Sequence, residues 1–323
     1  MPVSRSKALQ FLSALLLITL FIQPQSLVYA ATFTVTNTSN TGDGSLRFAI
    51  LNANATSGHD IIEFRIPGNA VHTISLTTAL PDIVYPVTIT GETEEGWTAA
   101  TAALPANLRV VLNGSAIGGN GLKFAAGSDG STVRGLVLRQ FEDGIRIESS
   151  NNVIAGNHIG VSADGLTDGG NTSDGIRVYG ANNLIGGLLP ADRNVLSGNG
   201  DYGLVLIDGS AHTVQGNFIG TDSTGTAAIQ NDDGGLLVTF STEVLICGTA
   251  SGSRNVISGN YGHGIYVNAD RTTIQGNYIG LTVTGMSAVP PGAGGRNNDN
   301  GIYVSSTAGF DTLIGGETPA RAT

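Results

Sequence analysis

The chain has 323 residues, of which 41% are hydrophobic and only 6% aromatic, so it can bury a long core of Val, Ile and Leu but not a large aromatic core. Its formal net charge of −10 disfavours nucleic acid and anionic membrane surfaces as partners. The single cysteine, Cys247, excludes a disulfide framework and a cysteine metal cluster.

Residues 1–30 are predicted to be an export signal. Arg5 and Lys7 form its positive segment, residues 8–22 its apolar segment, and Ala30 ends a small-residue cleavage site. The apolar run is short for a membrane-spanning helix, so we expect cleavage and export to the cell surface or medium, without membrane insertion of the mature chain. Removal of this segment leaves 13 basic and 25 acidic residues, a formal net charge of −12.

Residues 31–118 are expected to form an N-terminal cap and the first strands. A strand begins at Phe33, and Ser45 is placed to cap a short helix. We expect this helix to cover the end of the repeats, because an uncapped solenoid exposes an unpaired edge that invites end-to-end association. The buried face of the helix is predicted to be Leu46, Ala49, Ile50 and Ala53. Further alternating strands are expected at 61–66, 72–76 and 87–90.

Residues 119–323 contain internal repeats. The pentapeptides GNHIG, GNFIG and GNYIG, at Asn157, Asn217 and Asn277, are spaced 60 residues apart. Within that period, a glycine followed by an apolar, any, apolar triplet recurs at Gly121, Gly144, Gly175, Gly203, Gly235, Gly264 and Gly301. Two further apolar strips follow each triplet and end in Gly, Asn or Asp. Together these features predict an all-β protein, a three-sided parallel β-helix of about seven turns.

The 60-residue unit is a pair of turns whose long loops leave from different corners. One turn inserts residues 221–233 after its third strand, and its partners insert residues 188–193 and 249–254 before it. Three glycines recur at the same place in the long loops although the residues around them differ: Gly165, Gly225 and Gly285. A glycine kept in this way indicates a turn with positive φ. The third repeat stops at GGETPARAT where earlier copies continue into RNVLSGN and RNVISGN, so we expect the sequence to be a fragment of a longer protein.

Several segments resemble a known group of proteins. GSLRFAILNAN, LPDIVYPVTITGETEEGW, NVISGN and GNYIG resemble bacterial exported proteins built from right-handed parallel β-helix repeats. Within the pectate-lyase-like superfamily they are similar to the group with a CSLREA-type N-terminal region, and the resemblance runs from Phe33 almost to the C-terminus. It implies a right-handed β-helix, in keeping with the preference of parallel crossovers. Such repeats occur in surface proteins, adhesins and polysaccharide-active enzymes alike, so the resemblance does not select a function.

One column of side chains is a candidate binding face. The middle residue of each triplet is expected to face solvent, because its apolar neighbours point inward. The column reads Lys123, Arg146, Arg177, Val205, Leu237, Tyr266 and Tyr303. Cations suit uronate carboxylates and tyrosine faces suit sugar rings, so the candidate glycan-binding residues are Lys123, Arg146, Arg177, Tyr266 and Tyr303. The resemblance adds that pectate-lyase-like enzymes commonly carry their substrate groove on this face.

An alternative interpretation of the three cations stays open. Asp143, Glu148 and Asp174 lie close to them in the sequence, so the cations could be neutralised locally. Exposed ion pairs of this kind contribute roughly 0–1 kcal/mol to stability and imply no ligand.

Stacked asparagines are expected to be structural. In a β-helix they hydrogen-bond to one another and to backbone groups along the axis. The predicted ladder is Asn157, Asn194, Asn217, Asn255 and Asn277. His158 aligns with Phe218 and Tyr278, which indicates a packing position. The segments DGG at Asp233 and NYGHG at Asn260 are interpreted as turns.

Catalysis finds less support in the sequence. A lyase needs a base beside the uronate carboxylate together with charge stabilisation, and a glycosidase needs two carboxylates at a fixed separation. Asp164 and Asp222 do not occupy equivalent loop positions, so we interpret them as turn formers, and a Ca²⁺ role for them is left open. No catalytic residue, cofactor or metal ligand is assigned.

Three functional hypotheses remain. The leading one is a secreted or cell-surface β-helical binding or scaffold module that contacts polysaccharide. The second is a polysaccharide lyase or another glycan-active enzyme that uses the face around Arg146 and Arg177. The third is a structural spacer within a longer surface protein. The ligand and the oligomeric state are not predicted.

Overall fold

The structure is a computed structural model that describes residues 30–290, 297–307 and 309–315. The predicted export signal up to residue 29 and the end of the third repeat from residue 316 lie outside the described residues. Within the described part of the chain, no helix is long and apolar enough to cross a membrane.

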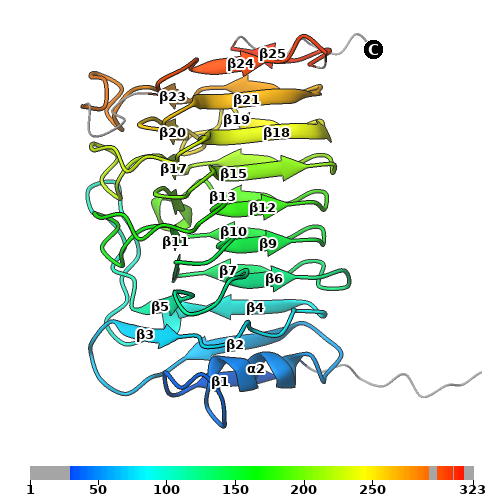
Figure 1. Cartoon of the computed structure of the whole chain (residues 1–323), viewed down its shortest axis with the longest axis vertical. Helices are drawn as coiled ribbons and strands as arrows, with labels where there is room; N and C mark the ends of the chain where they lie inside the picture. Colours follow the sequence, from blue (N-terminus) through cyan, green and yellow to red (C-terminus); the bar gives the residue numbers. More distant parts are fainter. Residues whose placement is uncertain (1–29, 291–296, 308, 316–323) are drawn as a thin grey trace, which may run out of the picture.

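Three parallel sheets run along the length of the molecule, and its successive turns stack into a tall solenoid (Figure 1). They contain ten, eight and seven strands and are called sheets A, B and C. Along the repeats, each turn supplies one strand to each sheet, and neighbouring strands within a sheet come from successive turns. The chain is therefore a three-sided parallel β-helix, as the repeats predict, and its seven triplets supply the seven strands of sheet C.

The strands of each sheet follow in chain order. Sheet A consists of β1 (Thr32–Val35), β2 (Asp60–Phe64), β4 (Val87–Thr90), β7 (Thr132–Arg134), β10 (Val153–Ala155), β13 (Leu184–Gly186), β16 (Thr213–Gln215), β19 (Leu245–Cys247), β22 (Thr273–Gln275) and β25 (Leu313–Ile314). Sheet B consists of β3 (His72–Ser75), β5 (Val110–Asn113), β8 (Leu136–Arg139), β11 (His158–Ile159), β14 (Val195–Leu196), β17 (Phe218–Ile219), β20 (Val256–Ile257) and β23 (Tyr278–Ile279). Sheet C consists of β6 (Leu122–Phe124), β9 (Ile145–Ile147), β12 (Ile176–Val178), β15 (Tyr202–Ile207), β18 (Gly234–Thr242), β21 (His263–Asp270) and β24 (Ile302–Val304).

The core is a stack of aliphatic side chains inside the three sheets. In sheet C, the first apolar residue of each triplet aligns with its counterpart on the next turn, and all are fully buried from β6 to β21. Burying a side chain of this size contributes roughly 1.5–3 kcal/mol. The members of this column are Leu122, Ile145, Ile176, Leu204, Leu236 and Ile265. Because the inward position is fixed in every turn, the middle residue of each triplet points to the outer face.

The predicted N-terminal helix is present as α2 (Leu46–Ala53), at the same end of the stack as β1 (Figure 1). The Ser45 side chain accepts a hydrogen bond from the Phe48 backbone N–H, which caps the helix. Its buried residues are Leu46, Ala49, Ile50 and Ala53, so the predicted helical face is confirmed. Its role in preventing end-to-end association stays a prediction.

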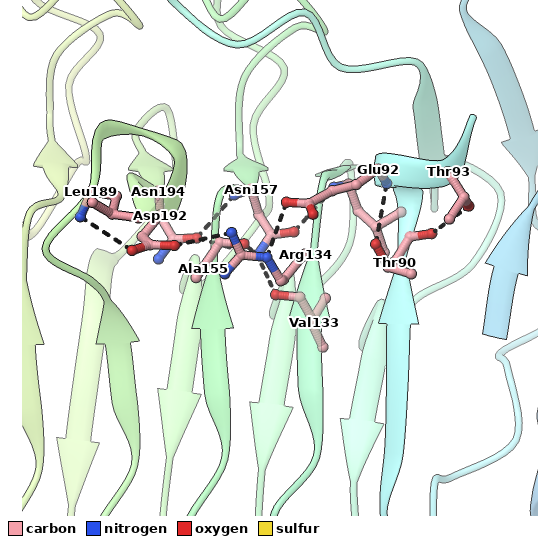
Figure 2. A network of polar contacts seen from close by, with 11 residues as sticks. Thr90, Glu92, Thr93, Val133, Arg134, Ala155, Asn157, Leu189, Asp192 and Asn194 are labelled. Carbon is pink, nitrogen blue, oxygen red and sulfur yellow. Dashed lines mark hydrogen bonds and ion pairs between the residues drawn. The ribbon is translucent and has the colours of Figure 1, made fainter. Parts of the chain in front are cut away.

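Two short 3₁₀ helices are tied together at the corner between sheets A and B. They are η1 (Gly91–Thr93) and η2 (Pro190–Asp192). Figure 2 shows Arg134 between them, with its Nε 3.0 Å from Glu92 and its Nη2 3.0 Å from Asp192. The guanidinium therefore links the N-terminal region to a loop inserted in the repeats.

The predicted asparagine column forms a hydrogen-bonded ladder along the corner between sheets A and B. Asn157 Nδ2 donates to Asn194 Oδ1 at 3.2 Å, and Asn194 donates to Asn217 at 2.9 Å (Figure 2 shows the first two members). The ladder continues through Asn255 to Asn277 at 3.1 and 2.8 Å. These amides also donate to backbone carbonyls, so buried polar groups at the corner are satisfied.

A second ladder, which the sequence analysis missed, lies at the corner between sheets B and C. Its successive Nδ2–Oδ1 distances are 2.9, 2.8, 2.8 and 3.0 Å. Its members are Asn171, Asn199, Asn231, Asn260 and Asn297. Asn199 and Asn260 belong to the SGN segments of the repeats, which were the signal available in the sequence.

The loop glycines at the 60-residue interval have the predicted positive φ. Gly165, Gly225 and Gly285 have φ values of 69°, 70° and 69°. Each also faces an aromatic ring on the outer side of sheet B, so that a Cβ at Gly165 would lie 2.9 Å from the His158 ring, and one at Gly225 would lie 2.9 Å from the Phe218 ring. His158 thus occupies the packing position predicted for it. Burial lowers the pKa of His158 to about 4, so this ring is neutral at pH 7.

The two segments interpreted as turns are partly strands, and that prediction was wrong. Gly234 begins β18 and His263 begins β21, and the two residues are partners in the parallel ladder. These strands are longer than the triplets because backbone pairing extends one residue before the triplet glycine and several residues beyond the triplet. The extension brings His263 onto the outer face of sheet C beside the candidate column.

Candidate functional site on the outer face of sheet C

The structure brings the whole candidate column into one line. Each middle residue is the direct register partner of the next, from Lys123 on β6 to Tyr303 on β24. Neighbouring strands lie about 4.8 Å apart, so the side chains form a continuous strip parallel to the solenoid axis. An extended chain molecule could contact several of them at once.

One member of the column is not at the surface. Val205 is only 2% exposed, whereas a solvent-facing position was expected. Its register partners on the neighbouring turns are Arg177 and Leu237. Val205 and the half-buried Leu237 separate a charged half of the column from an aromatic half.

The first two cations of the charged half are held by carboxylates. Lys123 Nζ lies 2.9 Å from Asp82 and 3.5 Å from Glu148. Arg146 Nε donates to Glu148 at 2.8 Å, and this hydrogen bond is the main reason that the pKa of Glu148 is lowered. Arg146 also lies over the Tyr179 ring, with its Cζ 4.7 Å from the ring centroid. Both cations are therefore engaged within the protein.

Arg177 lies above two buried carboxylates. Its Nη2 is 2.6 Å from Asp174 Oδ2, an ion pair without hydrogen-bond alignment, and its Nε is 3.5 Å from Asp143 Oδ2. Asp174 is 0% exposed, and burial raises its pKa to about 7 although Arg177 and the Tyr202 backbone N–H oppose the shift. Asp143 also faces Arg146 at 3.7 Å.

The charged half is consequently neutralised from within. Its three cations face four carboxylates, namely Asp82, Asp143, Glu148 and Asp174. The structure therefore agrees with the alternative interpretation of local neutralisation. An anionic ligand would have to displace carboxylates that already occupy the guanidinium and ammonium groups.

The aromatic half forms a cluster of three rings, His263, Tyr266 and Tyr303, called the aromatic platform below. The His263 and Tyr303 rings are stacked, with centroids 5.0 Å apart and planes 8° apart. Tyr266 lies 5.0 Å from Tyr303 at 36° and 5.6 Å from His263 at 41°. Tyr303 remains 39% exposed. A surface of adjoining, partly open rings is suited to stacking against the flat face of a ligand.

Tyr202 continues the aromatic side chains toward the middle of the sheet. It pairs with Gly234, and a Cβ on Gly234 would lie 2.8 Å from the Tyr202 ring, so the glycine leaves room for the ring. Burial raises the pKa of Tyr202 to about 12, and the nearby Asp233 adds to the shift. Tyr202 and His263 are not among the candidate residues predicted from the sequence, because both lie outside the triplets, one residue before a triplet glycine.

The loop carboxylates behave as turn formers. Asp164 Oδ1 accepts a hydrogen bond from the Leu166 N–H at 3.0 Å, and Asp222 Oδ1 accepts one from the Thr226 N–H at 3.0 Å. In residues 30–290, 297–307 and 309–315, no group of three or more His, Cys, Asp or Glu side chains is arranged to hold a metal ion.

Two of the larger clefts in the described part of the chain lie away from the column. One, of about 400 Å³, is lined by Cys247, Ser253 and Arg254 together with neighbouring loop residues. The other, of about 510 Å³, lies between the loops that contain Asp168 and Gln230. Neither of these clefts is lined by a residue of the candidate column.

Comparisons with known proteins concern only the architecture. No protein-family model and no curated protein sequence matches the chain. Among solved structures, ORF18 of Geobacillus virus E2 aligns with a TM-score of 0.38 and 10% identity over 86% of this chain and 56% of that protein. This chain thus spans little more than half of the viral protein. The A-module of the Azotobacter vinelandii mannuronan C-5 epimerase AlgE4 aligns with a TM-score of 0.38 and 16% identity over 90% of this chain and 98% of that module.

Proposed function

We propose that the protein is an exported β-helical binding and scaffold module that holds polysaccharide along the outer face of sheet C. The observation that carries the proposal is the aromatic platform of His263, Tyr266 and Tyr303, whose ring centroids are 5.0–5.6 Å apart. Sugar rings bind to proteins largely by laying their C–H faces on such side chains. The rigid solenoid fixes the rings without loop ordering, which lowers the entropic cost of binding.

The proposal is tested by the retention of the purified exported protein in native gels that contain soluble polysaccharides. The unmodified protein should be retarded by at least one polymer, and a Tyr266→Ala, Tyr303→Ala double variant should migrate as in a gel without polymer. Tyr85→Ala is the matched control, because Tyr85 is also an exposed tyrosine (42%) but lies in the N-terminal region. If no polymer retards the unmodified protein, the structural-spacer hypothesis takes its place.

A second candidate function is a polysaccharide lyase centred on the charged half. The observation that favours it is Asp174, whose pKa near 7 is the value wanted in a general acid or base, beside Arg177 at 2.6 Å. In β-elimination a base takes the proton next to the uronate carboxylate, the glycosidic C–O bond breaks, and a conjugated C=C bond forms. The full burial of Asp174 opposes this role, because the carboxyl would have to reach a substrate proton.

Ultraviolet absorbance tests the lyase hypothesis during incubation with acidic polysaccharides, with and without Ca²⁺. A rise that Asp174→Asn and Arg177→Ala abolish would establish elimination. A flat trace on polymers that the protein binds would leave the non-catalytic module, with hydrolysis to be checked by reducing-end assay.

A further inference from the structure

We infer that the polysaccharide is an uncharged, hydroxyl-rich pyranose chain and that it docks on the aromatic half rather than on the cationic residues. The inference rests on the proposed function and specifies its ligand class. It reverses the preference for acidic polysaccharide that the residue types alone suggest.

The charged half offers little to an acidic chain. Every cation of the column already has a carboxylate partner, at 2.9 Å for Lys123, 2.8 Å for Arg146 and 2.6 Å for Arg177. A uronate would replace one carboxylate by another, and the displaced protein carboxylate would be left without its cation. Two of these carboxylates, Asp143 and Asp174, are nearly fully buried, so leaving them unpaired is costly.

Acidic side chains also lie around the aromatic platform. Asp299 Oδ2 is 3.9 Å from His263 Nδ1 at one side of the rings. Near Tyr202, burial together with Asp201 and Asp232 raises the pKa of Asp233, so several carboxyl groups share that end. Like charges repel an anionic polymer, whereas carboxylate oxygens accept hydrogen bonds from sugar hydroxyls. The surroundings of the rings thus favour neutral sugars.

The shape of the strip suits a chain rather than a single sugar. Tyr266 and Tyr303 are register partners on adjacent strands, and their rings follow one another along the solenoid axis. Tyr202 lies two turns earlier at the strand position of Gly234 and His263. A pyranose chain lying along the axis can therefore meet the platform and then the Tyr202 side without leaving the face.

Matched pairs of polymers test the inference in affinity gels of the exported protein. The pairs are a soluble glucan, mannan and galactan, each beside the uronate polymer of the same sugar. We expect at least one neutral polymer to retard the protein while its uronate partner retards it at least about 10-fold less per unit concentration. Because the contact is uncharged, retardation should persist from low salt to about 0.5 M salt.

Variants separate the two halves of the face. Tyr303→Ala should weaken binding of the neutral polymer by about 5- to 30-fold, whereas Arg146→Gln should change it less than about 2-fold. Stronger binding of a uronate polymer that is lost in Arg146→Gln and kept in Tyr303→Ala overturns the inference while leaving glycan binding in place. No retardation by any of the six polymers overturns the proposed function and the inference with it.

Discussion

The two halves of the side-chain column on sheet C differ in whether their side chains are available to contact a ligand. On β6, β9 and β12 the column carries cations that are bound to carboxylates of the same protein, and on β21 and β24 it carries rings that are partly exposed. The backbone register is continuous through both halves. The comparison teaches that a regular scaffold can place side chains in one line, but contacts within the same turn and with adjacent turns decide whether each side chain is available to a ligand.

The largest expected effect is the pH dependence of the free energy of unfolding that Asp174 causes. This dependence would be the clearest sign that the charged half has a role in folding. Its pKa is raised from 3.8 to about 7, so the folded state holds a proton that the unfolded state has released between these values. The stabilising contribution is therefore complete below about pH 4 and is lost as pH rises through about 7. Each pKa unit corresponds to about 1.4 kcal/mol, so the full swing is on the order of 4 kcal/mol.

Urea unfolding of the unmodified protein and of Asp174→Asn at pH 5 and pH 8 measures this swing. The stability of the variant relative to the unmodified protein should rise by about 2–3 kcal/mol from pH 5 to pH 8, because the asparagine does not ionise and about two pKa units of the swing lie in this range. A constant difference between the two pH values would show that Asp174 is not held in a desolvated site.

Replacement of Arg177 by Met should be the next largest effect. The change removes the cation above Asp143 and Asp174 while keeping most of the side-chain volume, and breaking a buried pair typically costs about 3–5 kcal/mol. The arginine side chain is 26% exposed, so we expect a smaller loss of about 2 kcal/mol in the free energy of unfolding at pH 8. The loss should shrink at pH 5, where Asp174 is protonated. An unchanged urea midpoint at pH 8 would mean that the ion pairs do not stabilise the charged half.

Truncation of Tyr303 should have the opposite profile, with a small effect on folding and a larger one on binding. The ring is 39% exposed, so its loss should cost less than about 1 kcal/mol of stability. Binding of the neutral polymer should fall by about 5- to 30-fold, which corresponds to about 1–2 kcal/mol. Unfolding midpoints and gel retardation of the same preparation separate the two effects. If Tyr303→Ala lowered the stability as much as Arg177→Met, the aromatic half would be as important for folding as the charged half, and the distinction between the two halves would be lost.

The smallest effect is expected for Lys123→Gln. Its ammonium pairs with Asp82 and Glu148, but the lysine side chain is 30% exposed, and such pairs contribute about 0–1 kcal/mol. Both stability and neutral-polymer retardation should stay within about 1 kcal/mol of the unmodified protein. A strong loss of retardation in this variant would show that the polymer binds at the charged half instead.

The sequence predicts the fold because each turn repeats the same inward and outward pattern. A period of two within each triplet suffices to place Arg146 and Tyr303 on one outer face, and the recurring asparagines suffice to place Asn157 and Asn217 at one corner. Loop glycines such as Gly225 follow from their period in the same way. These features depend only on the local pattern and its repetition.

The closeness of Asp143, Glu148 and Asp174 in the sequence predicts local neutralisation of the cations, but it does not specify which carboxylate each cation contacts. The pairing of Arg177 with Asp143 joins residues of different turns, and it depends on side-chain directions that strand periodicity does not specify. His263 and Tyr202 precede a glycine, where a turn is the usual expectation, and only the pairing of Gly234 with His263 shows that strands begin there. The burial of Val205 is also not predicted, because the strand pattern places this residue on the outer face.

Hydroxyl-radical footprinting of tyrosine side chains, with and without the neutral polymer that retards the protein most, tests the central claim most directly. Tyr179 in the charged half and Tyr85 in the N-terminal region serve as internal comparators of the same chemistry. The account predicts that the polymer protects Tyr266 and Tyr303 from oxidation and leaves Tyr179 and Tyr85 unchanged. Protection of Tyr179 with no change at Tyr266 and Tyr303 would contradict it.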